Sequence, residues 1–217
     1  MARPRRNRLI GIGLTLALLL AMTLNTKFLT PAELAAVAPK QFDAAETAAG
    51  LFDQAKSGLP GRAAALSDVL PAIQSSPKAA AAKFKAVSPA EGTYVFAVKT
   101  TATVTQASAA NVRLKVPGLS DETPVLVPLS TAINGSVLRD AMGFKFADAP
   151  GQTEYQYVGD ELKKLVQADL KSSVQDPGSL KGKKVSVVGV VSVLDIGSPP
   201  PKAKPLNVQP LTVKALS

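Results

Sequence analysis

The residues between 134 and 155 are those whose types and spacing suit the binding of a ligand. Within the stretch "NGSVLRDAMGFKFAD", an Arg–Asp pair lies in an apolar segment and two phenylalanines follow on alternate positions. A guanidinium fork and a carboxylate beside aromatic faces suit a sugar or a carboxylate ligand. The predicted ligand-binding residues are Asn134, Arg139, Asp140, Phe144, Phe146 and Tyr155.

A structural role is the alternative interpretation of the same residues. Consecutive residues of a strand point to opposite faces, so Arg139 and Asp140 need not pair with each other. On that pattern Phe144 and Phe146 would share one face. In this interpretation Arg139 packs its stem within the protein and meets a carboxylate elsewhere, which anchors segment 131–150 against the rest of the fold.

The composition restricts the catalytic chemistry. The chain has no His and no Cys, which excludes an imidazole base, a thiolate nucleophile and an ordinary zinc site. The S-x-x-K spacing of Ser75 and Lys78 lacks its S-D-N and K-T-G companions, and Ser76–Pro77 explains the stretch as a helix start. We therefore assign no catalytic residue, no metal and no cofactor. A glycan hydrolase remains the alternative function, with a carboxylate pair drawn from Asp140, Asp148, Glu154, Asp160 and Glu161.

The positive charge is concentrated at the N-terminus. The formal net charge is +9, and residues 1–30 hold five of the 25 basic residues and none of the 16 acidic ones. The remaining chain therefore carries 20 basic against 16 acidic residues, which is typical of a solvated surface. We expect no nucleic-acid partner.

An N-terminal membrane anchor is predicted from the first 28 residues. Four arginines precede 18 uncharged residues, 9–26, which as a helix rise about 27 Å and just span a bilayer core of roughly 30 Å. We predict a cytoplasmic basic tail over 1–8 and a transmembrane signal anchor over 9–28. The arginines place the following chain outside the cytoplasmic membrane as a single-pass protein. A cleaved secretory signal is the alternative, although no small-x-small site follows the apolar run closely.

Residues 29–87 are predicted to form a helical neck. Thr30, Pro31 and Glu33 match a capping box. A second helix over 41–56 is expected to stop at Gly58 and Pro60. "GRAAALSDVLPAIQ" places its large apolar residues on one helical face, and "SPKAAAAKFKAV" begins with a cap followed by proline.

From residue 88 the pattern changes to strands. The segments 93–107, 111–116, 124–129, 183–196 and 206–216 are rich in β-branched residues, and a helix is expected over 159–172 between the third and fourth. Gly189 falls where a bulge or barrel corner would lie. The sequence thus predicts an α+β fold: an anchor helix, a helical neck, then an OB-like β-barrel domain over 88–217 with one helix between strands 3 and 4.

Six stretches appear in a fixed order: "FDAAETAAGLFDQ", "LPGRAAAL", "SPKAAAAKF", "YVFAVKTTATV", "NGSVLRDAMGFKFAD…QTEY" and "LKGKKVSVVGVVSV". In these the chain, from about Phe42 to its C-terminus, resembles the DUF2291 family of bacterial periplasmic lipoproteins. The acylated cysteine of that family is missing here, so a transmembrane anchor would have to replace the lipid. The resemblance implies an extracytoplasmic protein, often encoded beside sugar ABC-transporter genes, and supplies no catalytic residues.

These observations together predict a binding or accessory protein that acts without turnover. Its expected partners are the membrane, through residues 9–28, and a small solute or a transporter component. A third interpretation is a structural tether whose neck sets the distance of the barrel from the membrane. Under that interpretation, substitution of Arg139 changes stability and leaves ligand binding unchanged.

Overall fold

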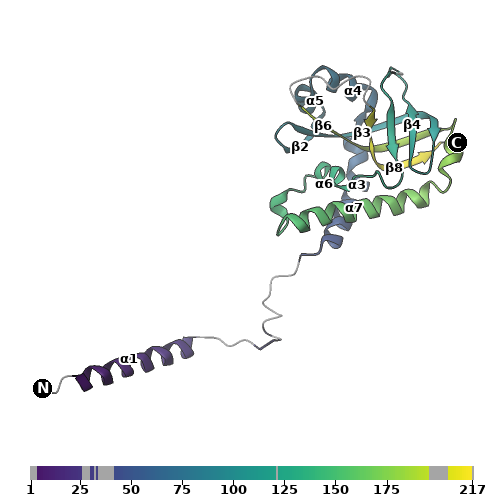
Figure 1. Ribbon diagram of the computed structural model, residues 1–217. Coiled ribbons are helices and arrows are strands. Elements are labelled where there is room, and N and C mark those ends of the chain that lie inside the picture. Colours follow the sequence, from purple (N-terminus) through teal and green to yellow (C-terminus); the bar gives the residue numbers. More distant parts are fainter. Residues whose placement is uncertain are drawn as a thin grey trace. The chain divides into compact units, whose positions relative to one another are not determined.

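The computed structural model describes residues 4–25, 30–31, 33, 42–120, 122–195 and 205–216 (Figure 1). The chain divides into two compact units, Met1–Gln41 and Phe42–Ser217. Each unit is described by itself. The second unit contains helices of the predicted neck together with all the strands of the predicted barrel.

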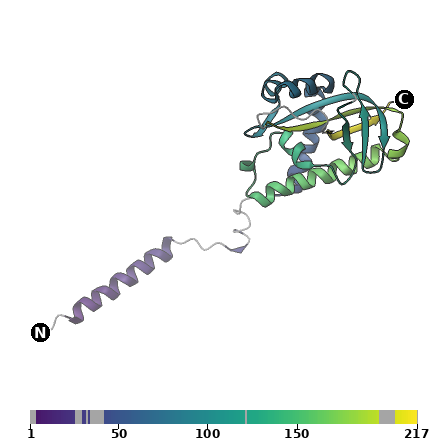
Figure 2. The same cartoon turned by 45° about the horizontal axis from the view of Figure 1, so that its top comes forward.

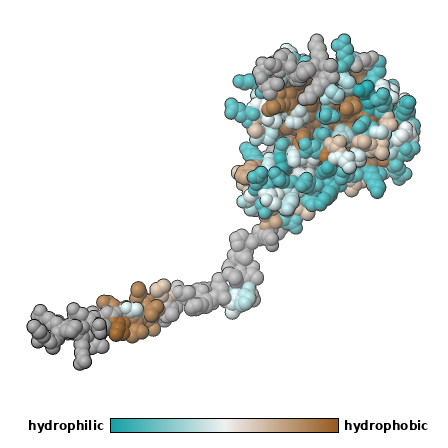
Figure 3. Space-filling model, viewed as in Figure 1, coloured by the Kyte–Doolittle hydropathy of each residue, from teal (hydrophilic) through white to brown (hydrophobic). Residues whose placement is uncertain are grey.

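The first unit contains helix α1, Pro4–Asn25. Its large apolar side chains between Ile12 and Met22 are exposed, and they form a brown surface in Figure 3. Within the described ranges, no helix combines the length and the apolarity required to cross a membrane. The predicted transmembrane anchor over 9–28 is therefore not supported, and residues 26–28 lie outside the described ranges. The first turns of α1 are occupied by the polar stretch that ends at Arg8, so its apolar part is shorter than the helix.

Three helices open the second unit. Helix α3, Ala44–Arg62, begins at Asp43, whose carboxylate accepts the N–H groups of Ala45 and Glu46. It continues past the predicted stop and includes Pro60, with Leu59 fully buried. Burial of the Leu59 side chain in this last turn outweighs the hydrogen bond that proline removes.

Helices α4 (Leu66–Ser75) and α5 (Pro77–Phe84) follow directly. The predicted apolar face of α4 is buried, and it consists of Leu66, Val69, Leu70 and Ile73. Ser76 caps α5 by accepting the N–H of Ala79, and proline occupies the first turn as predicted. Both helices pack against β3.

One sheet forms the centre of the unit. Its strands are β1 (Ala64–Ala65), β2 (Val87–Ala90), β3 (Thr93–Ala107), β4 (Asn111–Lys115), β5 (Val125–Pro128), β6 (Lys184–Leu194), β7 (Leu206–Asn207) and β8 (Gln209–Ala215). The main order is β7-β5-β4-β3-β6-β8, and β1 and β2 pair with β3. The long strand β3 pairs with the whole of β6, from Thr93 opposite Leu194 to Thr103 opposite Lys184.

The sheet curls because its last segment joins both of its edges. β7 pairs in parallel with β5, and β8, one residue later, pairs antiparallel with β6. The β6–β8 register shifts between Val188 and Gly189, so the predicted bulge at Gly189 is confirmed. A Cβ at this glycine would overlap the carbonyl oxygen of Gln209, which explains why a glycine is required there.

Two helices, rather than the single predicted one, lie between β5 and β6. They are α6 (Gly135–Ala141) and α7 (Gln152–Ser173), and the short 3₁₀ turns η1 (Phe146–Asp148) and η2 (Pro177–Leu180) lie on either side of α7. Figures 1 and 2 show α7 along one side of the sheet, with α4 and α5 on the other. Helix α7 packs against α3, α6 and β8, so it completes the core beneath the curled sheet.

Candidate functional site

Two of the predicted site residues, Arg139 and Asp140, lie in helix α6 and form an ion pair with each other. Arg139 donates from Nε and Nη2 to Oδ1 of Asp140, at 3.1 and 2.8 Å. Its Nη1 donates to the backbone oxygen of Tyr155 at 2.8 Å. Each nitrogen of the guanidinium group therefore has a protein acceptor, and the residue is only 5 % exposed.

Tyr155, near the start of α7, holds the network together. Its hydroxyl donates to the same Asp140 oxygen at 3.2 Å, and the guanidinium carbon of Arg139 lies 3.5 Å from the centre of its ring. Phe144 stacks with the ring at a centroid distance of 6.0 Å, and Phe146 meets it edge-on at 5.6 Å. The structure thus brings five of the six predicted residues together across α6, η1 and α7.

The environment of Tyr155 favours its neutral phenol. Burial raises the pKa of the Tyr155 hydroxyl above its ordinary value, and the negative charge of Asp140 raises this pKa further. The positive charge of Arg139 acts in the opposite direction. The phenol consequently stays protonated and serves as a hydrogen-bond donor to the carboxylate.

Asn134 has a separate role at the start of α6. Its side chain accepts the N–H of Ser136 and caps the helix, while its own N–H donates to the side-chain oxygen of Gln209 at 2.8 Å. The side chain of Asn134 makes a local cap, and its backbone links α6 to β8. The prediction joined it to the network because the two are close in sequence.

The structural interpretation expected Arg139 to meet a carboxylate elsewhere, and this is wrong, because its partner is the adjacent Asp140. That expectation rested on a strand pattern. The segment is a helix, in which the Asp140 carboxylate folds back onto its neighbour. Through its hydrogen bond to the Tyr155 carbonyl, Arg139 joins α6 to the first turn of α7. Ligand binding by the six residues remains a prediction.

Two glycines, Gly135 in α6 and Gly159 in α7, allow the two helices to approach each other closely. A Cβ at Gly135 would overlap the carbonyl oxygen of Gly159, and one at Gly159 would lie 2.6 Å from the Ser136 hydroxyl. The absence of both side chains lets the two helices touch through their backbones. This contact places Arg139 within hydrogen-bonding distance of the Tyr155 carbonyl.

Several carboxylates of the hydrolase hypothesis already have protein partners. Asp140 is bound by Arg139 and Tyr155, Asp148 accepts the N–H of Lys145 at 2.7 Å, and Glu161 pairs with Lys164 at 2.6 Å. In the described part of the chain, no three or more metal-ligating side chains gather in one place. These contacts assign structural roles to the acids concerned.

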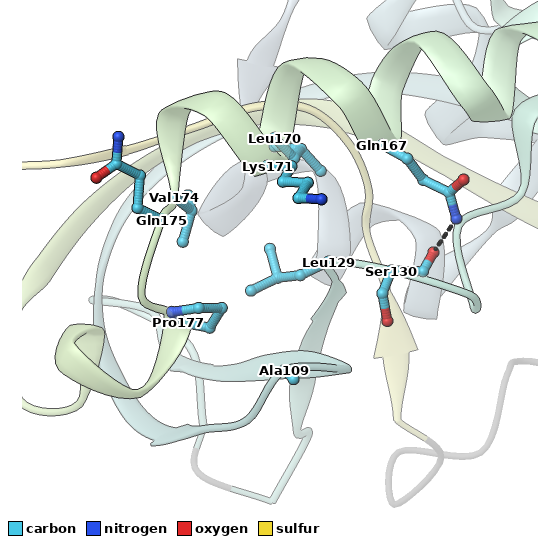
Figure 4. A pocket seen from close by; sticks show the side chains of 9 residues that line it. All are labelled: Ala109, Leu129, Ser130, Gln167, Leu170, Lys171, Val174, Gln175 and Pro177. Carbon is cyan, nitrogen blue, oxygen red and sulfur yellow. Dashed lines mark hydrogen bonds between the residues drawn. The ribbon is translucent and has the colours of Figure 1, made fainter.

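A hollow of about 270 Å³ lies at the C-terminal end of α7 (Figure 4). It is enclosed by the β3–β4 turn, the end of β5, the last turns of α7 and the chain that follows. Its lining residues are Ala109, Leu129, Ser130, Gln167, Leu170, Lys171, Val174, Gln175 and Pro177. In Figure 4, Leu129 and Pro177 lie opposite Val174 and Lys171. We call this space the α7-end hollow.

The walls of the α7-end hollow are mainly apolar. Leu129, Leu170 and Val174 are almost completely buried, at 9, 1 and 8 % exposure, and they form its floor. The amide of Gln167 donates to the backbone oxygen of Ser130 at 2.9 Å, which fixes α7 to the end of β5. Lys171 is exposed, and its ammonium group supplies a cation at the rim.

The chemistry of this hollow suits binding. Concave, largely apolar spaces with a few polar groups are typical of small-molecule sites, and this one lies near the small end of their size range. Its nine lining residues include no carboxylate, so they supply no acid pair for glycosidic cleavage. The sequence carries no signal for this site, because its residues come from three separate segments whose proximity depends on the barrel.

Comparison with known proteins identifies the relationships of the chain. A family model described as predicted periplasmic lipoprotein (DUF2291) matches residues 15–209. The chain is also similar to the crystal structure of an OB-fold protein from Thermotoga maritima, with a TM-score of 0.65 and 21 % sequence identity. That similarity covers 82 % of this chain and 100 % of the other, and it establishes the OB fold. None of the curated proteins compared with the chain matches it.

Proposed function

The chain belongs to the DUF2291 family of predicted periplasmic lipoproteins, and from this premise we propose that it is an extracytoplasmic binding or accessory protein that holds a small solute without chemical turnover. The solute occupies the α7-end hollow. The observation that carries this proposal is the combination of a buried apolar floor and a single rim cation, with no carboxylate among the lining residues.

The chemistry of the hollow indicates the class of solute. Leu129 and Val174 offer a surface for the apolar face of a small ring, and Lys171 offers a donor to a hydroxyl or carboxylate oxygen. A monosaccharide or a small organic acid meets both conditions. We further propose that the protein assists a sugar ABC-type uptake system, which rests on the family resemblance.

A thermal-shift screen of the full chain against monosaccharides and small carboxylic acids tests the proposal. A ligand at 100 times its Kd adds about 2.7 kcal/mol to the folded state. In a chain of this size, that corresponds to a rise in Tm of roughly 5–11 °C. Mass spectrometry of the same mixtures then shows whether the ligand is recovered unchanged.

A matched pair of variants locates the site. Ala109 lines the hollow and is exposed in the β3–β4 turn, so Ala109→Trp fills the space without disturbing the core. Ala110, its exposed neighbour, does not line the hollow and provides the control Ala110→Trp. We expect Ala109→Trp to abolish the rise in Tm and Ala110→Trp to retain it. A rise that survives in Ala109→Trp would exclude this hollow, and a chemically altered ligand would show an enzyme.

The cellular location is tested separately. We propose that residues 42–217 face the outside of the cytoplasmic membrane, in agreement with the family description. Protease added to spheroplasts should degrade the protein, whereas protection in intact spheroplasts would contradict an extracytoplasmic location.

Membrane contact through residues 9–28 is a further part of this proposal. It is supported by the exposed apolar side chains of α1 in the described portion of that segment, such as Leu14 and Leu20 at 68 and 64 %. The protein should sediment with membranes after a carbonate wash. Recovery in the soluble fraction would contradict membrane contact while leaving solute binding unaffected.

A further inference from the structure

A second hollow, of about 230 Å³, lies on the outer face of the barrel. It is enclosed by β4, the chain that follows it and the start of β5. Its lining residues are Thr105, Arg113, Leu114, Lys115, Val116, Leu119, Ser120, Thr123, Pro124 and Val125. This hollow, here called the β4 hollow, shares no lining residue with the α7-end hollow.

Arg113 is the distinctive residue of the β4 hollow. It lies in the middle of β4, between Gln106 of β3 and Leu126 of β5. Its neighbours Val112 and Leu114 are buried in the barrel, so Arg113 projects to the outer face, where it is half-buried. A cation is thereby fixed on a rigid, centrally paired strand.

The Nε–H group of Arg113 has no hydrogen-bond partner although it is sealed from solvent, with less than 1 Å² of accessible surface. In this respect it contrasts with Arg139, each of whose guanidinium nitrogens has an acceptor. A buried donor without a partner is costly, and it indicates a place where an acceptor is missing. The desolvation of Nε–H has already occurred on folding, so an acceptor that reaches it displaces no water from it.

Two further residues make the β4 hollow suitable for an anion. Ser120 accepts the N–H of Glu122 at 3.2 Å through its hydroxyl oxygen, and the hydroxyl proton can turn to another acceptor. Lys115, two residues along the same face of β4, adds positive charge to the lining. Glu122 is exposed and is not among the lining residues, so its carboxylate does not fill the space.

We propose that the β4 hollow binds a small oxyanion, a carboxylate or phosphate group, on the guanidinium fork of Arg113. On binding, the half-buried side chain rotates its guanidinium into the hollow, where Nε, sealed in the free protein, and one Nη donate to two oxygens of the anion. Such bidentate geometry is the strongest mode in which arginine binds these groups, and lysine cannot reproduce it. Ser120 donates to a third oxygen, and Lys115 contributes charge.

NMR of the arginine Nε–H resonances in the ¹⁵N-labelled full chain tests this proposal. Inorganic phosphate and acetate are titrated separately against chloride at constant ionic strength, which distinguishes the two kinds of oxyanion. We expect a saturable shift of the Arg113 resonance with at least one probe. The resonance of Arg139, already bonded to Asp140, should stay in place and serves as the internal control.

Variants make the test specific. Arg113→Lys keeps the charge and should weaken binding of the effective probe more than tenfold, as read from the rise in Tm that the probe causes. Ser120→Ala should weaken it severalfold. An Arg113 resonance unmoved by both probes would overturn the proposal, as would an unchanged affinity in a folded Arg113→Lys variant. Because this hollow is separate from the α7-end hollow, Ala109→Trp should leave oxyanion binding unchanged.

Discussion

Removal of the Asp140 carboxylate should strongly destabilise the second unit. In Asp140→Ala, the guanidinium of Arg139 loses the acceptor of two of its hydrogen bonds, and the Tyr155 hydroxyl loses its acceptor as well. The side chain of Arg139 is 7 % exposed, so little water reaches the guanidinium to replace the carboxylate. The variant therefore leaves a buried positive charge without compensation.

The size of the effect follows from this burial. Breaking a buried ion pair by removing one partner costs about 3–5 kcal/mol. The side chain of Asp140 is 20 % exposed, and water that enters there lowers the expected loss to the bottom of that range, about 3 kcal/mol. A loss of that size lowers Tm by roughly 6–12 °C in a domain of this length.

Urea denaturation followed by far-UV circular dichroism measures the loss. The control is Asp169→Ala, which breaks the Lys56–Asp169 pair, where the side chains are 35 and 29 % exposed. Its loss should stay within about 1 kcal/mol because both groups are partly solvated. The double variant Arg139→Met/Asp140→Ala removes the stranded charge and should be more stable than Asp140→Ala alone. If Asp140→Ala is no more harmful than the control, the network does not hold α6 to α7.

Three further predictions use the same denaturation assay. Gly135→Ala should cost about 1–3 kcal/mol or more, since its Cβ would overlap the Gly159 carbonyl oxygen; wild-type stability would contradict the close helix contact. Gly50→Ala should stabilise the protein by about 0.5–1 kcal/mol, because this exposed position in α3 has no atom within 4 Å of the new Cβ. A lower free energy of unfolding would contradict the open space at this position. The pKa of Tyr155 is higher in the folded state than in the unfolded chain. The neutral phenol therefore stabilises the fold below about pH 10, and this stabilisation is lost as pH rises through the folded-state pKa. Wild type should therefore lose more stability than Tyr155→Phe between about pH 9 and pH 11, and equal losses would refute this.

The strands could be predicted from the sequence because their signal is local. Segment 93–107 is β-branched and ends at a turn, and the observed strand is Thr93–Ala107. The order of the five predicted strands, with helical structure between the third and fourth, is the order found in the structure. A buried strand must match the pleat of its neighbours, so composition alone indicates it well.

The helices were predicted less completely, for reasons that lie outside the local pattern. Helix α3 continues past Gly58 because Leu59 is buried against the rest of the unit. Helix α6 is only seven residues long, and its start at Asn134–Gly135 resembles an ordinary turn. Its stability comes from packing against α7, which sequence periodicity cannot show.

The candidate sites were predicted least well. The sequence placed Arg139 and Tyr155 in one group, and the structure brings them together. The sequence alone could not show that the two residues bond to each other. The α7-end hollow depends on Ala109, Leu129 and Val174, which carry no chemical signal of their own. Surfaces made by ordinary apolar residues from distant segments become visible only when the fold brings them together.

Methyl NMR of the full chain, titrated with the ligand that most raises Tm, tests the proposed function most directly. We predict saturable shifts of the Leu129 and Val174 methyl groups, with Val213, fully buried in β8, unchanged. The ligand signals in the same samples should stay constant over a day, which shows binding without turnover. Shifts centred on Leu138 and Met142 would place the ligand at the Arg139 network instead, and the appearance of product signals would contradict a non-enzymatic role.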